Sequence, residues 1–450
     1  MEQDVEVQSV YSGPERRQHD PELARRILKG LNKPAKHGVV RSLGLGLITG
    51  AADDDPSAIG TYAAAGATFG PSFLWTAPVT FPMMFAVVYL SGKLGQVAGK
   101  GLFAVIREHY PRWLLYGSLI GVLIRNIIEA GADLGGMAAA LNVLVPLPVG
   151  WIVIGVTLTI LGLQIWGSYT LIRNIFRWLA LALLAYVGSA LLAKPELWPV
   201  LKGTFVPHIY FTKEFLSMLV AVIGTTLSAY LYTWQSNQDV EGDISMGRRR
   251  LTDRVGTTKA ELQHTARDVG FGMFFSNLVM YFIILSTAAT LFHAGKTDIN
   301  TAADAAQALR PLAGNAAGWL FAIGVIGVGF LAVPVMTIGA AYDLSQTLGW
   351  KHGLHAKPKE ARKFYIAITV FTFLAMGLNF FGINPMKALV WAGIVQGFST
   401  PFLMLLVMLI TNNRQIMGRW VNSRAMNILG WVTTVAIFAA AVGLVIVTWF

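Results

Sequence analysis

The sequence predicts an all-α integral membrane protein. Hydrophobic residues make up 54% of the 450 residues and charged residues only 13%, about half the charged share of a soluble domain. Apolar segments of about 20 residues, the length that crosses a bilayer as a helix, recur along the chain. They are too long for barrel strands, and only helices or closed barrels satisfy their backbone groups in lipid. We therefore expect a bundle of helices that spans a lipid bilayer.

Eleven segments are long and apolar enough to be spanning helices. The residues before them, 1–41, are polar and basic and form a predicted cytoplasmic N-terminal segment. Within it, 21–33 has an apolar side and a basic side, so it is either an interfacial helix or part of a disordered tail. The predicted spans are 42–66, 71–91, 116–143, 149–166, 171–193, 214–235, 269–293, 315–342, 363–382, 386–410 and 429–449.

The basic residues predict the orientation of these helices. The net charge of +11 would suggest a nucleic-acid partner in a soluble protein, but here Lys and Arg gather in alternate loops, as they do in cytoplasmic loops. We therefore expect no nucleic-acid partner. The N-terminus is predicted in the cytoplasm and the C-terminus outside, in the inner (plasma) membrane of a bacterium. With this topology the outer loops hold only Lys194, Lys202, Lys213, Lys296, Arg310 and Lys387.

The segment 49–60, TGAADDDPSAIG, places Asp53, Asp54 and Asp55 inside the first predicted span. One Asp at a helix centre costs about 2.5–3.5 kcal/mol on insertion scales, so these groups must face a cavity or a cation rather than lipid. Pro56 removes a backbone donor and disfavours helical angles at the preceding residue, which predicts an unwound turn. Because carboxylates and free carbonyls bind hard cations, we interpret this segment as a cation site. The alternative is a kinked helix whose second half is capped by an Asp.

The sixth predicted span, 214–235, is expected to carry a matching break. Transporters built from inverted repeats pair two broken helices at corresponding positions, and five helices per repeat make helix 6 correspond to helix 1. Residues 224–228, GTTLS, are small or hydroxylated, although they include no proline and so give a weaker signal. The predicted repeats are 42–193 (helices 1–5) and 214–410 (helices 6–10), followed by helix 11 at 429–450.

Three charged residues share one face of the third predicted span. Arg125, Glu129 and Asp133 are spaced by four residues, so Arg125 and Glu129 can pair. They form either a charge-balanced stripe at a helix contact or a polar track that leads away from the cation site, and we favour the track because intramembrane carboxylates are usually functional. Three amides in later spans are interpreted as interhelical hydrogen-bonders: Asn277, Asn379 and Gln396.

Three stretches resemble the natural resistance-associated macrophage protein (Nramp) family of divalent-metal transporters. They are DDDPSAIGTY in helix 1, EAGADLGGMAAALNVL in helix 3 and GTTLSAYLYTWQS in helix 6, and the resemblance extends over roughly residues 40–449. It implies a LeuT-type fold with two inverted five-helix repeats, one extra helix, and helices 1 and 6 broken at the metal site. It also implies a transporter rather than an enzyme, with the metal ion as substrate and no cofactor.

The chain departs from the family pattern at the implied site. The family motif Asp-Pro-Gly-Asn is DPSA at 55–58, and Met-Pro-His is SAY at 228–230. In helix 3, Asp-Leu-Ala-Glu becomes DLGG at 133–136. The aspartate of helix 1 remains, whereas the thioether, which favours soft transition metals, and the histidine are lost.

This altered pattern is similar to that of the Nramp-related magnesium transporters. An oxygen-only, roomy site suits partly hydrated Mg²⁺, which loses water reluctantly, and would also accept Mn²⁺. Because Tyr230 stands where the family has histidine, the resemblance implies weak or no proton coupling.

The resemblance also assigns roles to individual positions. The implied metal ligands are Asp55, the carbonyls of Ala52 and Thr225, and Ser228. Partners that act through water or at longer range are Asp53, Asp54, Ser57 and Tyr230. The remaining candidates, for a proton or polar track, are Arg125, Glu129 and Asp133.

Two alternative functions stay open at this stage. One is a proton-coupled Mn²⁺ or Fe²⁺ importer of the parent Nramp type, and the other is an organic-cation symporter on the same fold. A membrane-embedded metalloenzyme is disfavoured because none of the eight His residues falls centrally within a predicted span. The sequence makes no prediction of oligomeric state.

Overall fold

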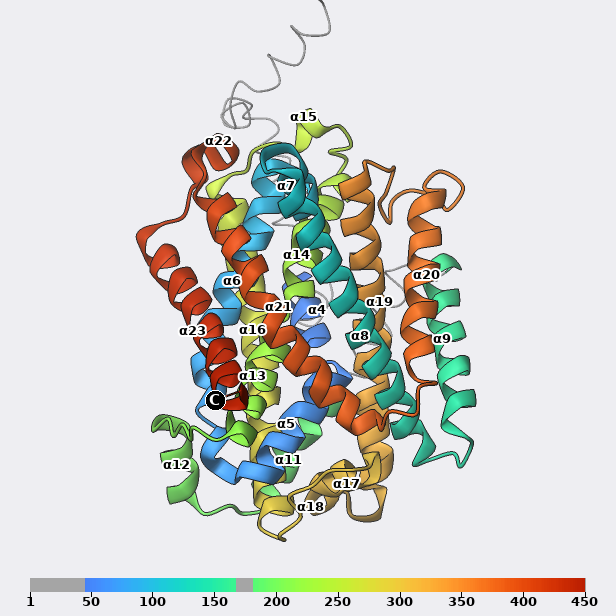
Figure 1. Ribbon diagram of the computed structural model, residues 1–450, viewed down its shortest axis with the longest axis vertical. Helices are drawn as coiled ribbons and strands as arrows, with labels where there is room; N and C mark the ends of the chain where they lie inside the picture. Colours follow the sequence, from blue (N-terminus) through green and yellow to red (C-terminus); the bar gives the residue numbers. More distant parts are fainter. Residues whose placement is uncertain (1–44, 167–180, 450) are drawn as a thin grey trace, which may run out of the picture.

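The computed structural model describes residues 45–166 and 181–449 (Figure 1). The predicted N-terminal segment 1–41, with its proposed interfacial helix at 21–33, lies outside the described residues. So does the first part of the predicted span 171–193. In the described part of the chain the regular structure is helical, with helices, 3₁₀ turns and one π-helical turn joined by short loops. This agrees with the predicted fold class.

Helices lie at the predicted spans, but some extend beyond them: α14 ends at Ser245 rather than at 235, and α16 begins at Lys259 rather than at 269. The first half of the chain contains α4 (Leu45–Asp53), α5 (Pro56–Phe69), α6 (Thr76–Ala98), α7 (Leu102–His109), α8 (Arg112–Asn142), α9 (Val149–Trp166) and α11 (Ala185–Leu192). The second half contains α12 (Leu197–Phe205), α13 (Lys213–Thr226), α14 (Ala229–Ser245), α15 (Leu251–Arg254), α16 (Lys259–Thr287), α17 (Ala302–Ala306), α18 (Arg310–Ala313), α19 (Ala317–Leu348), α20 (Arg362–Leu378), α21 (Pro385–Asn412), α22 (Arg414–Met417) and α23 (Arg424–Trp449).

Eight helices of the described residues are long and apolar enough to cross a membrane, so the predicted total of eleven stays a prediction. Three predicted spans account for the difference. The first is divided into α4 and α5, which have only 9 and 14 residues. Only 8 residues of the fifth are described as α11, and α20 has 17 residues, slightly fewer than a typical spanning helix.

The short helices outside the predicted spans gather at the two ends of the bundle. Figure 1 shows α7, α15 and α22 at one end and α12, α17 and α18 at the other. We call these the α7 end and the α12 end. The predicted topology requires this division, because it assigns the first three segments to the cytoplasmic side and the other three to the outer side. The sequence thus predicts that the α7 end faces the cytoplasm.

Both predicted helix breaks are present. Helix 1 stops at Asp53 and restarts at Pro56, which occupies the first turn of α5, where a missing N–H has no cost. Helix 6 stops at Thr226 and restarts at Ala229. Figure 1 shows α4 and α14 nearer the α7 end, and α5 and α13 nearer the α12 end. Each break therefore divides its helix into one half toward each end.

The break in helix 6 forms without proline because hydroxyl groups satisfy the freed carbonyls. The Ser228 Oγ donates to the Thr225 carbonyl at 2.5 Å, and the Tyr232 hydroxyl donates to the Leu227 carbonyl at 2.7 Å. The Thr225 carbonyl lies in the last turn of α13 and the Leu227 carbonyl at its C-cap, where the helical partners are lost at the break. Short side chains that bond locally to the backbone compete with helix formation in this way.

Glycine allows the broken helix 6 to pack closely against α21. Gly224 lies one turn before the break, and a Cβ at this position would be 2.2 Å from the Gly393 carbonyl oxygen. Gly397 lies equally close on the same helix. Small residues allow helix backbones to approach in membranes, where packing replaces the hydrophobic effect between helices. This contact fixes the position of the helix 6 break along the axis of α21.

Candidate metal site

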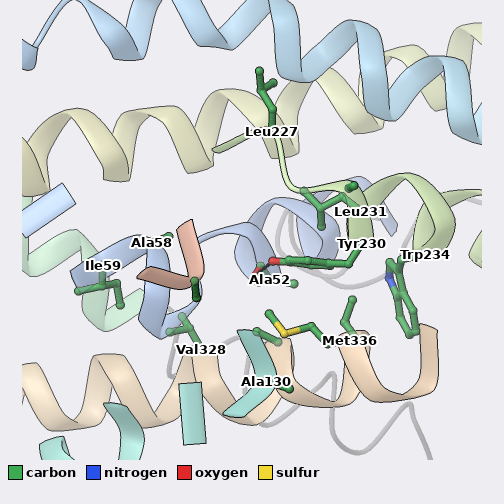
Figure 2. Packing of buried hydrophobic residues seen from close by; sticks show 14 of the residues in the cluster. Ala52, Ala58, Ile59, Ala130, Leu227, Tyr230, Leu231, Trp234, Val328 and Met336 are labelled. Carbon is green, nitrogen blue, oxygen red and sulfur yellow. Dashed lines mark hydrogen bonds between the residues drawn. The ribbon is translucent and has the colours of Figure 1, made fainter. Parts of the chain in front are cut away.

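Tyr230 connects the break in helix 1 with the second half of helix 6. Its hydroxyl lies 2.8 Å from the Ala52 carbonyl oxygen and 3.1 Å from Asp55 Oδ2, and it donates to these acceptors. Figure 2 shows the Tyr230 ring extending from α14 toward Ala52. All three residues have 0% exposed surface. The structure thus brings together three residues that the sequence assigns to the metal site.

Asp55 caps the second half of helix 1. Its Oδ1 accepts a hydrogen bond from the Ala58 backbone N–H at 2.7 Å and another from the Ser57 hydroxyl at 2.7 Å. Its backbone is extended, with φ −62° and ψ 170°, as expected for an N-cap. The capping alternative is therefore correct for Asp55. It does not exclude a metal role, because Oδ2 is directed to Tyr230 and toward the helix 6 half.

Asp53 and Asp54 face α16 rather than Tyr230. The Ser276 hydroxyl lies 2.8 Å from Asp53 Oδ2 and 3.2 Å from Asp54 Oδ1. A hydroxyl has one proton, so it cannot fully satisfy both carboxylates. The other oxygens, Asp53 Oδ1 and Asp54 Oδ2, are buried without a hydrogen-bond partner. Burying such groups is costly unless protons or a cation balance them.

The acidic residues of α8 contact the start of α5 through Ser57. The Ser57 N–H donates to Asp133 Oδ1 at 2.9 Å, and its hydroxyl lies 3.4 Å from Glu129 Oε1. Gln396 of α21 also donates to Glu129, which agrees with its interpretation as an interhelical hydrogen-bonder. Ser57, Glu129, Asp133 and Asp55 therefore form one connected polar group beside the helix 1 break.

The expected pair between Arg125 and Glu129 does not form. The Arg125 Nη2 donates instead to Asn126 Oδ1 at 2.7 Å, and its other two nitrogens have no hydrogen-bond partner. The reason is that the Glu129 carboxylate is turned toward Ser57 and Gln396, away from the preceding helical turn. Arg125 remains close enough to Glu129 and to Asp343 of α19 for electrostatic attraction.

Thr225 and Ser228 bond to each other across the helix 6 break. The Thr225 carbonyl accepts from the Ser228 hydroxyl, so two predicted metal ligands are adjacent. In the described parts of the chain, no group of three or more His, Asp or Glu side chains is arranged to hold a metal ion.

Sequence reasoning missed two buried polar residues, Ser276 and Asp343. Ser276 belongs to α16, where a lone serine in a long apolar run gives no signal. Asp343 is fully buried on α19, whereas the predicted span ended at residue 342. The helix continues to Leu348. A predicted helix that was allowed to be longer than the bilayer core would have included Asp343.

A separate cavity of about 700 Å³ lies at the α7 end. Parts of α7, α14 and α19 line it, and the Gln346 amide of α19 bonds to Asn237 of α14 at 2.5 Å beside it. Two Glu residues, Glu108 and Glu241, also line the cavity. The Lys and Arg residues that line it are Lys100, Arg107, Arg249, Arg254 and Lys351.

A helical membrane bundle with two broken helices that meet beside a buried carboxylate has the architecture of an inverted-repeat transporter. Comparison with known families agrees. The sequence profile of the family described as natural resistance-associated macrophage protein-like matches residues 46–447, nearly the whole described chain. The protein belongs to this family.

Individual relatives extend over the same length. The divalent metal cation transporter MntH of Deinococcus radiodurans is 29% identical over 434 residues, which cover 94% of this chain and 93% of the relative. The protein of the same name from Klebsiella pneumoniae is 28% identical over 402 residues, with 87% and 90% covered.

Solved structures confirm the LeuT-type fold. A manganese transporter of Eremococcus coleocola, in complex with an aromatic bis-isothiourea compound, superposes with a TM-score of 0.69 at 17% identity, covering 92% of this chain and 88% of that one. The nucleobase–cation symporter Mhp1 in a closed conformation gives 0.50 at 12% identity, covering 89% and 92%. At these identities the likeness extends to the fold alone.

Proposed function

We propose that the protein is a transmembrane transporter that takes up divalent cations, Mn²⁺ and Mg²⁺, by alternating access with weak or no proton coupling. The observation that carries this proposal is the buried Asp55 carboxylate at the helix 1 break, which shares the Tyr230 hydroxyl with the Ala52 carbonyl. A carboxylate and a carbonyl that converge on one point supply the oxygen ligands that hard divalent cations prefer. Relatives named as divalent metal cation transporters support the same conclusion.

The choice of Mg²⁺ as well as Mn²⁺ follows from the ligand types at the breaks. Asp55, Ala52, Thr225 and Ser228 offer a carboxylate, carbonyls and a hydroxyl, all oxygen donors. Without a sulfur ligand, the site has no chemical preference for softer transition metals. Mg²⁺ keeps several of its waters in most protein sites, and the uncharged oxygens at the breaks can accept hydrogen bonds from those waters.

Uptake can proceed without protons because the membrane potential drives cations inward. Each elementary charge gains about 2.3 kcal/mol per 100 mV, so a divalent ion gains about twice that. The histidine that the family pattern places in helix 6 is Tyr230 here, and a phenol, whose ordinary pKa is about 10, does not change its protonation state near neutral pH. We therefore propose a carrier driven by the cation gradient and the potential.

One observation favours the proton-coupled alternative. Asp55, Ser57, Glu129 and Asp133 form a continuous polar group, and chains of intramembrane carboxylates serve as proton relays in many transporters. In this alternative a proton leaves the group when the cation binds. The same group in the uncoupled carrier only positions the start of α5.

Uptake of Mn²⁺ into proteoliposomes, with Mg²⁺ as competitor and an internal pH dye, tests these functions together. We expect Mn²⁺ entry that Mg²⁺ inhibits, without acidification of the lumen. Acidification in step with Mn²⁺ entry, abolished by Glu129→Gln or Asp133→Asn, would establish the coupled alternative. A wild-type protein that moves no divalent cation would refute the transport proposal as a whole.

A further inference from the structure

The Tyr230 hydroxyl occupies the point on which two predicted metal ligands converge. The Ala52 carbonyl oxygen and Asp55 Oδ2 lie 2.8 and 3.1 Å from the same phenolic oxygen. Both are acceptors, and a phenol has one proton to donate. The hydroxyl hydrogen, which carries a partial positive charge, therefore lies between two negative oxygens. A cation would be attracted to the same position.

This contact connects the halves of helices 1 and 6 that lie toward the same end of the bundle. Ala52 belongs to the last turn of α4 and Tyr230 to the first turn of α14. These two half-helices both lie toward the α7 end in Figure 1. The bond between them therefore ties the two half-helices together toward that end.

We propose that the Tyr230 hydroxyl is an internal competitor of the transported cation, and that the cation must displace it from Ala52 and Asp55. The inference rests on the proposed transport of divalent cations. In the ion-free protein the hydroxyl shares its one proton between the two oxygens and holds α4 against α14. A bound cation takes over both oxygens, and the displaced tyrosine releases α14 from the helix 1 break.

Such a competitor sets a threshold that every bound cation must exceed. Every cation must break the same two hydrogen bonds, whatever its charge. The attraction to Asp55 is proportional to the charge of the ion, so a monovalent ion gains only half as much in return. Tyr230 therefore lowers the affinity of every cation by the same factor. A weakly held monovalent ion then no longer binds at ordinary salt concentrations, whereas a more tightly held divalent ion still does.

Calorimetry with MnCl₂ on detergent-purified protein tests this role in the variant Tyr230→Phe, which keeps the buried ring and removes the hydroxyl. Tyr186→Phe is the matched control, because Tyr186 is also buried but its hydroxyl, on α11, has no hydrogen-bond partner among the described residues. We expect Tyr230→Phe to bind Mn²⁺ about tenfold more tightly, the equivalent of about one net hydrogen bond. The control should stay within about twofold of the wild type.

Competition by monovalent salt gives a second readout. It would not differ between Tyr230→Phe and the wild type if Tyr230 had a purely structural role. At fixed ionic strength, replacing an organic cation by Na⁺ should weaken Mn²⁺ binding in Tyr230→Phe and leave the wild type unchanged. Mn²⁺ binding that is unchanged or weaker in Tyr230→Phe than in the wild type would overturn the proposal, since it would make Tyr230 either a bystander or a ligand. A wild-type protein that binds no divalent cation would instead count against the proposed function.

Discussion

Asp55→Asn is the substitution that best separates the metal role of Asp55 from its capping role. An asparagine can still accept from the Ala58 N–H and the Ser57 hydroxyl, which lie 2.7 Å from the present carboxylate. Asn and Asp are about equally good N-caps, so we expect the free energy of unfolding to change by less than about 1 kcal/mol. The change removes one negative charge from a site with no exposed surface.

The expected loss of cation binding is large. Two unit charges 4 Å apart attract by about 4 kcal/mol at an effective dielectric constant of 20, and a divalent ion doubles this. Desolvation of the ion and the carboxylate cancels part of that attraction. Even if half remains, Mn²⁺ affinity falls by more than about 100-fold, since each 1.4 kcal/mol is a factor of ten.

Calorimetry with MnCl₂ and proteoliposome uptake measure this loss, and thermal unfolding checks the fold. Asp298→Asn is the matched control, because Asp298 is an exposed carboxylate in the loop before α17. If Asp55→Asn binds Mn²⁺ within threefold of the wild type while remaining folded, the carboxylate is only a helix cap. The oxygen site at the helix 1 break would then have to be abandoned.

Three further changes test other parts of the structure. Gly224→Ala places a Cβ 2.2 Å from the Gly393 carbonyl oxygen, so overpacking should lower the free energy of unfolding by about 1–3 kcal/mol; an unchanged melting temperature would contradict this contact. Ser228→Met adds a soft ligand and should raise the ratio of Mn²⁺ to Mg²⁺ affinity roughly tenfold, whereas an unchanged ratio would remove Ser228 from the site. The hydrogen bond to Glu241 raises the pKa of His355 above its ordinary value. The stability that the His355–Glu241 pair contributes is therefore complete below about pH 6.5, the ordinary pKa of histidine. It is lost as pH rises through the raised pKa. As the pH rises through this pKa, proteolysis of the 349–361 loop should accelerate in the wild type. In His355→Gln the rate of proteolysis should show no such dependence on pH.

The helix 1 break could be predicted from sequence because its cause is local. Pro56 cannot donate to the preceding turn, and three adjacent carboxylates cannot face lipid. The helix 6 break gave a weaker signal, since part of its cause is the Tyr232 hydroxyl, which bonds back to Leu227 from the following helix. A tyrosine four residues beyond a break carries no sequence signal for that role.

The directions of the acidic side chains could not be predicted in the same way. Helical periodicity ends at Asp53, so the positions of Asp54 and Asp55 depend on contacts with other helices. Asp54 is directed to Ser276 and Asp55 to Tyr230, although the two are adjacent in sequence. On α8 the periodicity does hold, and Glu129 and Asp133 both reach Ser57 as their spacing predicts. Only Arg125 differs, because Glu129 has other partners.

The cavity at the α7 end has a basic lining. Five Lys and Arg residues against two Glu residues give it a positive potential, which lowers the local concentration of cations within about a Debye length, 8 Å at physiological salt. The predicted topology places this end in the cytoplasm, where the cavity would attract anions in preference to metal ions. Concentrated salt would screen this field and remove the preference.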